Sequence, residues 1–201
     1  LAAALVDAKP GMQVMDLCAG GGGKTLAIAA AMQNKGQIYA TDTDARRLGN
    51  LAPRMKRADA RNIQPMKWPQ DSNFGELTGK CDRVLIDVPC SGTGAWRRHP
   101  EQKWRVTAEE IEKLTKTQDA LLRTASNLVK PGGRLVYVTC SVLPSENEER
   151  IEAFLSSNAG FTAVFGESDP APAGEFGLRL APHSHGTDGF FVCRLERTST
   201  P

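Results

Sequence analysis

The chain has 201 residues, of which 40% are hydrophobic and 24% are charged, and its formal net charge is +2. This composition excludes disordered and fibrous proteins and predicts one globular domain with a sizeable core. No stretch approaches the roughly eighteen unbroken apolar residues of a membrane span, and so small a net charge does not by itself indicate a nucleic-acid partner. We therefore expect a soluble, cytoplasmic protein.

The first predicted element is a helix, because LAAALVDAKPG at residues 1–11 looks like the second half of an amphipathic helix. The sequence does not start with methionine. We therefore expect residues 1–201 to form a single domain that belongs to a longer chain.

Apolar, β-prone runs then alternate with segments of helical periodicity. The runs are residues 13–17, 37–42, 83–88, 134–140 and 189–195. The alternation predicts βαβ units and an α/β fold with a doubly wound, mostly parallel sheet. The last run follows a loop instead of a helix, so we expect it to be antiparallel to its neighbour.

Two helices carry sequence signals at their ends. Thr107 with Glu110, and Ser145 with Glu148, have the spacing of capping boxes. The segment KPGG at 130–133 is expected to end the first of these helices and to turn the chain into the next strand.

The five cysteines do not form a metal-binding or disulfide pattern. They stand at positions 18, 81, 90, 140 and 193, without CxxC pairs or the Cys/His spacing of zinc sites. We therefore expect no disulfide framework and no bound metal. Cys81 and Cys193 are interpreted as small buried apolar side chains, and His183 and His185 as residues of a solvated loop.

In doubly wound sheets, ligands bind beyond the carboxyl ends of the strands, and here those ends are rich in functional groups. They are DLCAGGGGKT at 16–25, Asp42, DVPCSGTG at 87–94 and VTCS at 138–141. Four glycines followed by Lys24 and Thr25 nearly spell a phosphate-binding loop, which would indicate an NTPase. That loop, however, requires glycine where Cys18 stands.

The glycine run also fits a turn that approaches a nucleoside cofactor closely. This interpretation requires an acid about twenty residues further on, at the end of the second strand, to bind the ribose hydroxyls, and Asp42 stands there. A plain tight turn, with Asp42 as a surface cap, is the third alternative.

Taken in order, these motifs resemble the bacterial Sun/Fmu family of RNA 5-methylcytosine methyltransferases, most closely its members that modify 16S ribosomal RNA. The motifs that carry the resemblance are DLCAGGGGKT, YATDTD, LIDVPCSGTG, RRHPEQKW, VTCSVLPSENEE and GTDGFFVCRL. The family implies a Rossmann-like, seven-stranded methyltransferase sheet, S-adenosylmethionine as methyl donor, and a cytosine in RNA as acceptor. The RNA is expected to be rRNA, with tRNA as an alternative.

The resemblance also implies residue roles. Cys140 is the nucleophile, Cys90 assists release of the product, and Asp87 faces the base, with Pro89 holding the turn rigid. A covalent step is chemically reasonable, because carbon 5 of cytosine becomes nucleophilic only after a thiolate has added to carbon 6. The residues implied in cofactor binding are Cys18, Ala19, Gly20, Gly21, Gly22, Gly23, Lys24, Asp42 and Asp87.

Further expectations concern Lys24, the RNA contacts and the adenine. Lys24 is expected to pair with an acid such as Asp87. The stretch at 96–105 supplies Arg97, Arg98, Lys103 and Arg105 for phosphates, and Trp96 or Trp104 for stacking. Gly21 replaces a proline that is frequent in the family and is expected to loosen the loop. The adenine contact is left between Trp68 and the region of Asp71.

The chain is thus predicted to be a monomeric, S-adenosylmethionine-dependent RNA methyltransferase domain, with an N-terminal RNA-binding region elsewhere in the full protein. Two alternatives stay open at this point. One is a P-loop-like NTPase, and the other is an RNA-binding module without catalysis.

Overall fold

The computed structural model describes residues 1–69, 74–165 and 176–199. The chain divides into two compact units. Unit 1 comprises residues 1–87, 124–136 and 197–201, and unit 2 comprises residues 88–123 and 137–196. Each unit is described by itself, and the assignment of residues 1–201 to a single catalytic domain stays a prediction.

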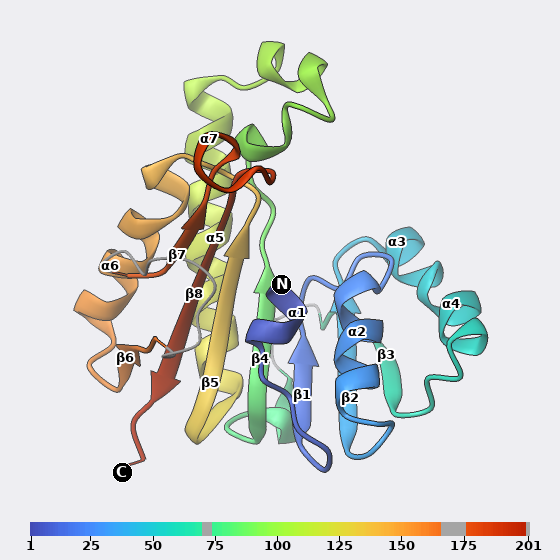
Figure 1. Cartoon of the computed structure of the whole chain (residues 1–201). Helices are drawn as coiled ribbons and strands as arrows, with labels where there is room; N and C mark the ends of the chain where they lie inside the picture. The colour runs from blue at the N-terminus through green and yellow to red at the C-terminus, as the bar shows by residue number, and fades with distance from the viewer. Residues whose placement is uncertain (70–73, 166–175, 200–201) are drawn as a thin grey trace. The chain divides into compact units, whose positions relative to one another are not determined.

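Unit 1 is built on parallel strands (Figure 1). They are β1 (Gln13–Asp16), β2 (Gln37–Asp42), β3 (Ile63–Lys67), β4 (Cys81–Asp87) and the first part of β5 (Val129–Thr139). Their order is β3-β2-β1-β4-β5. Because β1 pairs in parallel with β2 on one side and with β4 on the other, the carboxyl ends of these three strands lie at one edge of the sheet.

The helices of unit 1 place the loops at that edge. They are α1 (Ala2–Leu5), α2 (Gly23–Ala31), α3 (Ala45–Gly49), α4 (Leu51–Arg57) and the 3-10 turn η1 (Gly75–Leu77). Helix α2 buries Ile28 and Ala29, and the strands bury Val14, Ile38 and Leu85 completely. This apolar core fixes where the glycine loop leaves β1 and enters α2.

Unit 2 contains the remaining strands and the segments that carry the two cysteine motifs. Its strands are the end of β5, β6 (Phe161–Ala163), β7 (Leu178–Leu180) and β8 (Phe190–Arg197, of which residues 190–196 lie in unit 2). Its 3-10 turns are η2 (Thr93–Ala95), η3 (Pro100–Trp104) and η4 (Pro144–Glu146). Its helices are α5 (Ala108–Leu128, of which residues 108–123 lie in unit 2), α6 (Glu148–Ser157) and α7 (Pro182–His185).

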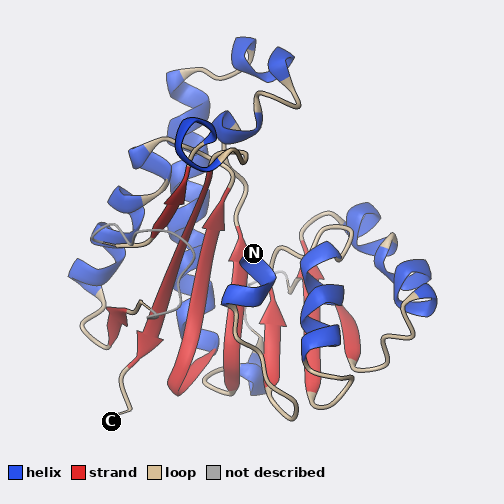
Figure 2. Ribbon diagram, viewed as in Figure 1, coloured by secondary structure: helices blue, strands red, loops and turns tan. Residues whose placement is uncertain are grey.

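Strand β8 organises unit 2. It is hydrogen-bonded between the end of β5 and β6, and it pairs antiparallel with β7. Figure 2 shows α6 beside these strands, and the Phe154 ring of α6 packs edge-on against Phe161 of β6, with 5.4 Å between ring centroids. Tyr137 of β5 and Phe191 of β8 form a second edge-on pair and are fully buried.

The α/β fold with a mostly parallel sheet and antiparallel strands near the C-terminus is confirmed. All five predicted strands are present, within a few residues of their expected bounds. β3 was not predicted, because IQPMK contains a proline and exposes most of its residues. Proline is tolerated on an edge strand, and β3 is the edge strand of unit 1.

Two local predictions were wrong. Ser145 does not cap α6, because it lies in η4 and Asn147 occupies the position before the helix. The prediction for KPGG was wrong only in its bounds: α5 ends just before it, at Leu128, but β5 already begins at Val129, so KPGG, with Gly132 at φ +71°, lies within the strand. The capping bond at α5 is confirmed, since the Glu110 N–H donates to Thr107 Oγ1 at 3.2 Å. Among the described residues, no helix has the length and apolarity needed to cross a membrane.

Candidate active site

The glycine loop lies between the end of β1 and the start of α2. Gly20 and Gly22 have φ of +52° and +80°, a region that favours glycine over residues with a side chain. A Cβ on Gly22 would lie 2.2 Å from Leu51 Cδ1, so this position has no room for a side chain. The Gly20 N–H donates to Asp42 Oδ2 at 2.8 Å, which joins the loop to the carboxyl end of β2.

Two arginines that the sequence analysis did not single out hold this loop from the side. Arg54 of α4 donates from Nη1 to the carbonyl of Gly21, and Arg47 Nη2 of α3 would lie 3.2 Å from a Cβ on Gly20. The loop that Gly21 was expected to loosen therefore has a charged anchor. Both arginines stand in a generally basic stretch, so no particular spacing marks them in the sequence.

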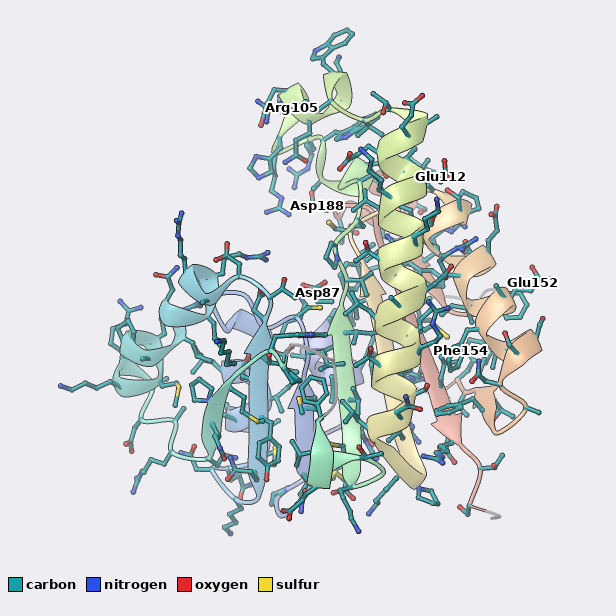
Figure 3. All side chains as sticks on the ribbon, turned by 180° about the vertical axis from the view of Figure 1, so that it is seen from behind. Asp87, Arg105, Glu112, Glu152, Phe154 and Asp188 are labelled. Atoms are coloured by element: carbon teal, nitrogen blue, oxygen red, sulfur yellow. The ribbon has the colours of Figure 1, made fainter. Side chains whose placement is uncertain are left out.

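Lys24 and Asp87 form the ion pair that was predicted. Lys24 Nζ lies 2.5 Å from Asp87 Oδ2, and each side chain is about one-third exposed, at 32% and 34%. Figure 3 shows Asp87 at the end of β4. Thr25, which follows Lys24, is fully buried, and its hydroxyl donates a hydrogen bond to Asp16 Oδ2 at 2.7 Å. Lys24 and Thr25 thus have protein partners, instead of facing a phosphate as they would in a P-loop.

Asp16 is the one acid of this site with a strongly raised pKa. Burial raises its pKa to about 7, with Asp87 adding to the shift and the Thr25 hydrogen bond opposing it. The folded state therefore binds a proton that the unfolded state, with an ordinary pKa near 3.8, has lost. The contribution of Asp16 to stability is thus present at low pH and is lost as the pH rises toward about 7.

Asp16→Asn is accordingly expected to change the pH dependence of stability. Relative to the wild type, the variant should gain free energy of unfolding, on the order of a few kcal/mol, between pH 5 and pH 8. Urea unfolding at the two pH values measures this gain. A difference between the two proteins that is constant with pH would contradict the assignment of the raised pKa to Asp16.

Three of the five thiols, those of Cys18, Cys81 and Cys193, are unsuited to act as nucleophiles. Burial, together with Asp16 and Asp42, raises the pKa of Cys18 well above its usual range. Cys81 and Cys193 are fully buried, as predicted, and burial raises the pKa of Cys81 to about 12.

Cys90 and Cys140 meet within unit 2. Their Sγ atoms are 3.3 Å apart, and either thiol can donate to the other. The hydrogen bond from Cys140, followed by burial, raises the pKa of Cys90 far above its usual range. The neighbouring thiol and burial thus favour the protonated form of Cys90.

Both thiols line a cavity of about 660 Å³. Its polar lining includes Arg98, His99, Gln102, Arg105 and Glu110. Positive side chains beside a thiol favour its thiolate, the form that attacks.

The segment expected to contact RNA forms part of this wall. Arg97 and Arg98 both pair with Asp188, at 3.2 and 2.6 Å, whereas Arg105 makes no ion pair with a described residue. Figure 3 shows Arg105 and Glu112 projecting to opposite sides of the unit. Trp104 is 80% exposed, with Lys103 Nζ 4.6 Å from its ring centroid.

Three buried polar residues beside the thiols were missed. Gln118, Glu146 and Asn147 are fully buried, and their side chains bond to the residues that flank Cys90 and Cys140. The sequence signal was present in SENEE, but it was interpreted only as a helix cap.

The structure places the adenine candidates only in part. Trp68 follows β3 directly and packs edge-on against Phe74, with 5.5 Å between ring centroids. Asp71 lies outside the described residues. Over the described ranges, no group of three or more His, Cys, Asp and Glu side chains has the arrangement of a metal site, and His183 and His185 lie exposed in α7.

The chain matches the family model described as 16S rRNA methyltransferase RsmB/F over residues 3–196. It belongs to this family. The resemblance seen in the motifs is thereby confirmed. Relatives include a probable ribosomal RNA small subunit methyltransferase B of Synechocystis sp., 38% identical over 97% of the chain and 45% of that protein. The ribosomal RNA small subunit methyltransferase B of Erwinia tasmaniensis is 36% identical over 96% of this chain and 44% of that protein.

Solved structures of similar proteins cover the whole fold. NSun6 from Pyrococcus horikoshii with SFG has a TM-score of 0.88 and 27% identity, covering 100% of this chain and 51% of that one. A methyltransferase homolog protein from the same organism has a TM-score of 0.81 and 32% identity, covering 97% and 64%. The chain spans less than half the length of the curated family relatives named above.

Proposed function

We propose that this chain transfers a methyl group from S-adenosylmethionine to carbon 5 of a cytosine in ribosomal RNA, through a covalent bond between Cys140 and the base. The observation that carries the proposal is the pair of thiols 3.3 Å apart in a cavity with basic walls. Such a site offers one sulfur for attack and a second for proton transfer.

The chemistry divides between the two thiols. The Cys140 thiolate adds to carbon 6, and the electron pair moved through the ring makes carbon 5 nucleophilic toward the methyl group. Carbon 5 then loses its proton to water, and the electron pair of that C–H bond expels the Cys140 thiolate from carbon 6, which restores the aromatic ring. Cys90, whose sulfur lies 3.3 Å from that of Cys140, assists this release.

Asp87 is proposed to bind the amino group of cytosine as a hydrogen-bond acceptor. Its side chain pairs with Lys24 and is one-third exposed, so it is accessible to a base. Uracil presents a carbonyl at the same ring position, which a carboxylate cannot bind.

The glycine loop and Asp42 fit S-adenosylmethionine, which would carry the methyl group on a sulfonium sulfur and leave as a neutral thioether. Asp42 Oδ2 accepts a hydrogen bond from the Gly20 N–H, and Oδ1 accepts one from the Asp44 N–H. Each oxygen retains a further lone pair for a ribose hydroxyl. Gly20 and Gly22 leave the backbone open to close approach.

Arg105 is expected to contribute a phosphate contact. Arg105→Gln should weaken RNA binding by roughly threefold to tenfold and reduce the slope of log K against log salt by about 0.7, the value for one contact to a single strand. Fluorescence anisotropy with an unstructured RNA oligonucleotide, titrated at several salt concentrations, measures both. Lys113→Gln on α5 removes the same charge away from the cavity, and an equal loss in both variants would contradict a specific contact.

Calorimetry and methyl transfer together test the proposed function. We expect binding of S-adenosylmethionine, no tight binding of ATP with magnesium, and incorporation of labelled methyl into 16S rRNA in preference to tRNA. The reverse nucleotide selectivity would indicate the NTPase, and RNA binding without methyl transfer would indicate a module without catalysis. The proposal includes a monomeric, cytoplasmic enzyme that needs no metal.

A further inference from the structure

The segment that carries Cys90 is fixed by a buried carboxylate. Glu146 is fully buried at the end of η4. Its Oε1 accepts from the Ser91 N–H at 2.8 Å, and its Oε2 accepts from the Ser91 hydroxyl at 2.5 Å. Two bonds to one residue fix both the backbone and the side chain of Ser91, the immediate neighbour of Cys90.

Gln118 of α5 completes this support. It is fully buried, and its Nε2 donates to the Pro89 carbonyl at 2.9 Å and to Glu146 Oε1 at 3.1 Å. The residues on both sides of Cys90 are thus held by one buried pair. Because a buried polar group that loses its hydrogen-bond partner is destabilising, the loop has little freedom to move away from Glu146.

The segment that carries Cys140 is fixed by Asn147, the residue that follows Glu146. Asn147 is fully buried. Its Oδ1 accepts from the Thr139 hydroxyl at 2.6 Å, and its Nδ2 donates to the Ser141 carbonyl at 3.0 Å. Thr139 and Ser141 stand on either side of Cys140, so this thiol is also held at both flanks.

The two anchors are covalently linked. Glu146 and Asn147 are joined by one planar peptide bond, which fixes the distance between their backbones. Each side chain reaches a different thiol-bearing segment. The separation of the two sulfurs, 3.3 Å, is therefore fixed by this dipeptide together with direct bonds between the two segments, such as that from the Gly94 N–H to the Cys140 carbonyl at 2.9 Å.

We propose that Glu146 and Asn147 are positioning residues that hold Cys90 and Cys140 in register, Glu146 for the release step and Asn147 for the attack step. The assignment to steps rests on the proposed function, whereas the control of the spacing between the sulfurs does not. Neither residue is proposed to touch the substrate.

A trivalent arsenical tests the spacing without any need for methyl transfer. Phenylarsine oxide forms two As–S bonds to a pair of adjacent thiols and releases its oxygen, with the two thiol protons, as water. The wild type should retain one bridging arsenical, measured by intact mass in excess monothiol. We expect Glu146→Gln and Asn147→Ala to weaken this retention at least about tenfold, and Cys90→Ala to abolish it.

The two variants should then differ in catalysis. With RNA that contains 5-fluorocytosine, Asn147→Ala should slow adduct formation roughly tenfold or more. With ordinary RNA, Glu146→Gln should form the adduct at close to the normal rate and accumulate it, because release is impaired. A merely structural role would lower both steps equally in both variants.

Matched controls come from the two ends of α6, the helix that follows Glu146 and Asn147. Glu148→Gln removes the same charge one residue beyond Asn147, from a side chain that pairs with Arg179. Asn158→Ala removes an amide that bonds to the Phe154 carbonyl at the other end of α6. Both controls should retain the arsenical and methylate normally. If Glu146→Gln or Asn147→Ala fails to fold, Ser91→Ala and Thr139→Val each remove one of these bonds, the hydroxyl bond, from the opposite partner.

The outcomes separate the two proposals. Wild-type arsenical retention in both positioning variants, or equal loss in the controls, overturns the proposal of this section. If the positioning variants retain the arsenical more weakly and the wild type transfers no methyl group, the control of the sulfur spacing is supported and the proposed function is overturned.

Discussion

Cys140→Ala is expected to abolish methyl transfer and to leave no covalent complex with RNA. Without a sulfur to add to carbon 6, carbon 5 of cytosine remains a poor nucleophile, and the positioned methyl donor cannot compensate. We expect a loss of at least about a thousandfold in rate, equivalent to roughly 4 kcal/mol of barrier. A filter assay of labelled methyl in RNA measures the rate.

The matched control for Cys140→Ala is Cys193→Ala, which removes a fully buried thiol of β8. The control should lower stability but retain turnover. Binding of S-adenosylmethionine should survive in Cys140→Ala, because the glycine loop and Asp42 belong to unit 1 and Cys140 belongs to unit 2. Methylation by Cys140→Ala at more than a few per cent of the normal rate would show that Cys140 is not the nucleophile.

Cys90→Ala is expected to accumulate a covalent adduct between protein and RNA. Attack by Cys140 and methyl transfer remain possible, but the thiol 3.3 Å away that assists release has gone. Denaturing gels of the variant with ordinary RNA and S-adenosylmethionine should show a shifted band that survives heating in detergent.

The adduct should depend on the remaining thiol. Cys90→Ala combined with Cys140→Ala should show no shifted band. If instead Cys140→Ala accumulates the adduct and Cys90→Ala does not, the two roles are exchanged.

The residues of the candidate site could be located from the sequence because they stand where strands end. Asp42 and Asp87 close predicted strands, and the glycine loop follows the first strand, so their positions in the fold follow from strand prediction alone. The pairing of Lys24 with Asp87 was expected from the resemblance to the family, and the structure confirms it.

The side-chain contacts that hold the site in place could not be predicted from the sequence. Arg54 reaches Gly21 across 33 positions of sequence, and Gln118 reaches Pro89 from the middle of a long helix. No local periodicity encodes such contacts. Glu146 and Asn147 were not singled out, because the segment was interpreted only as a capping box formed by Ser145 and Glu148, whereas here their side chains bond to the neighbours of the two thiols.

The most direct test of the account is to identify the residue bound to the base. The wild type is incubated with S-adenosylmethionine and rRNA containing 5-fluorocytosine, in which fluorine blocks the loss of the carbon 5 substituent. The adduct is digested and sequenced by mass spectrometry. We predict a methylated fluorocytosine attached to Cys140. Attachment at Cys90, or no attachment in a protein that methylates ordinary RNA, would contradict the account.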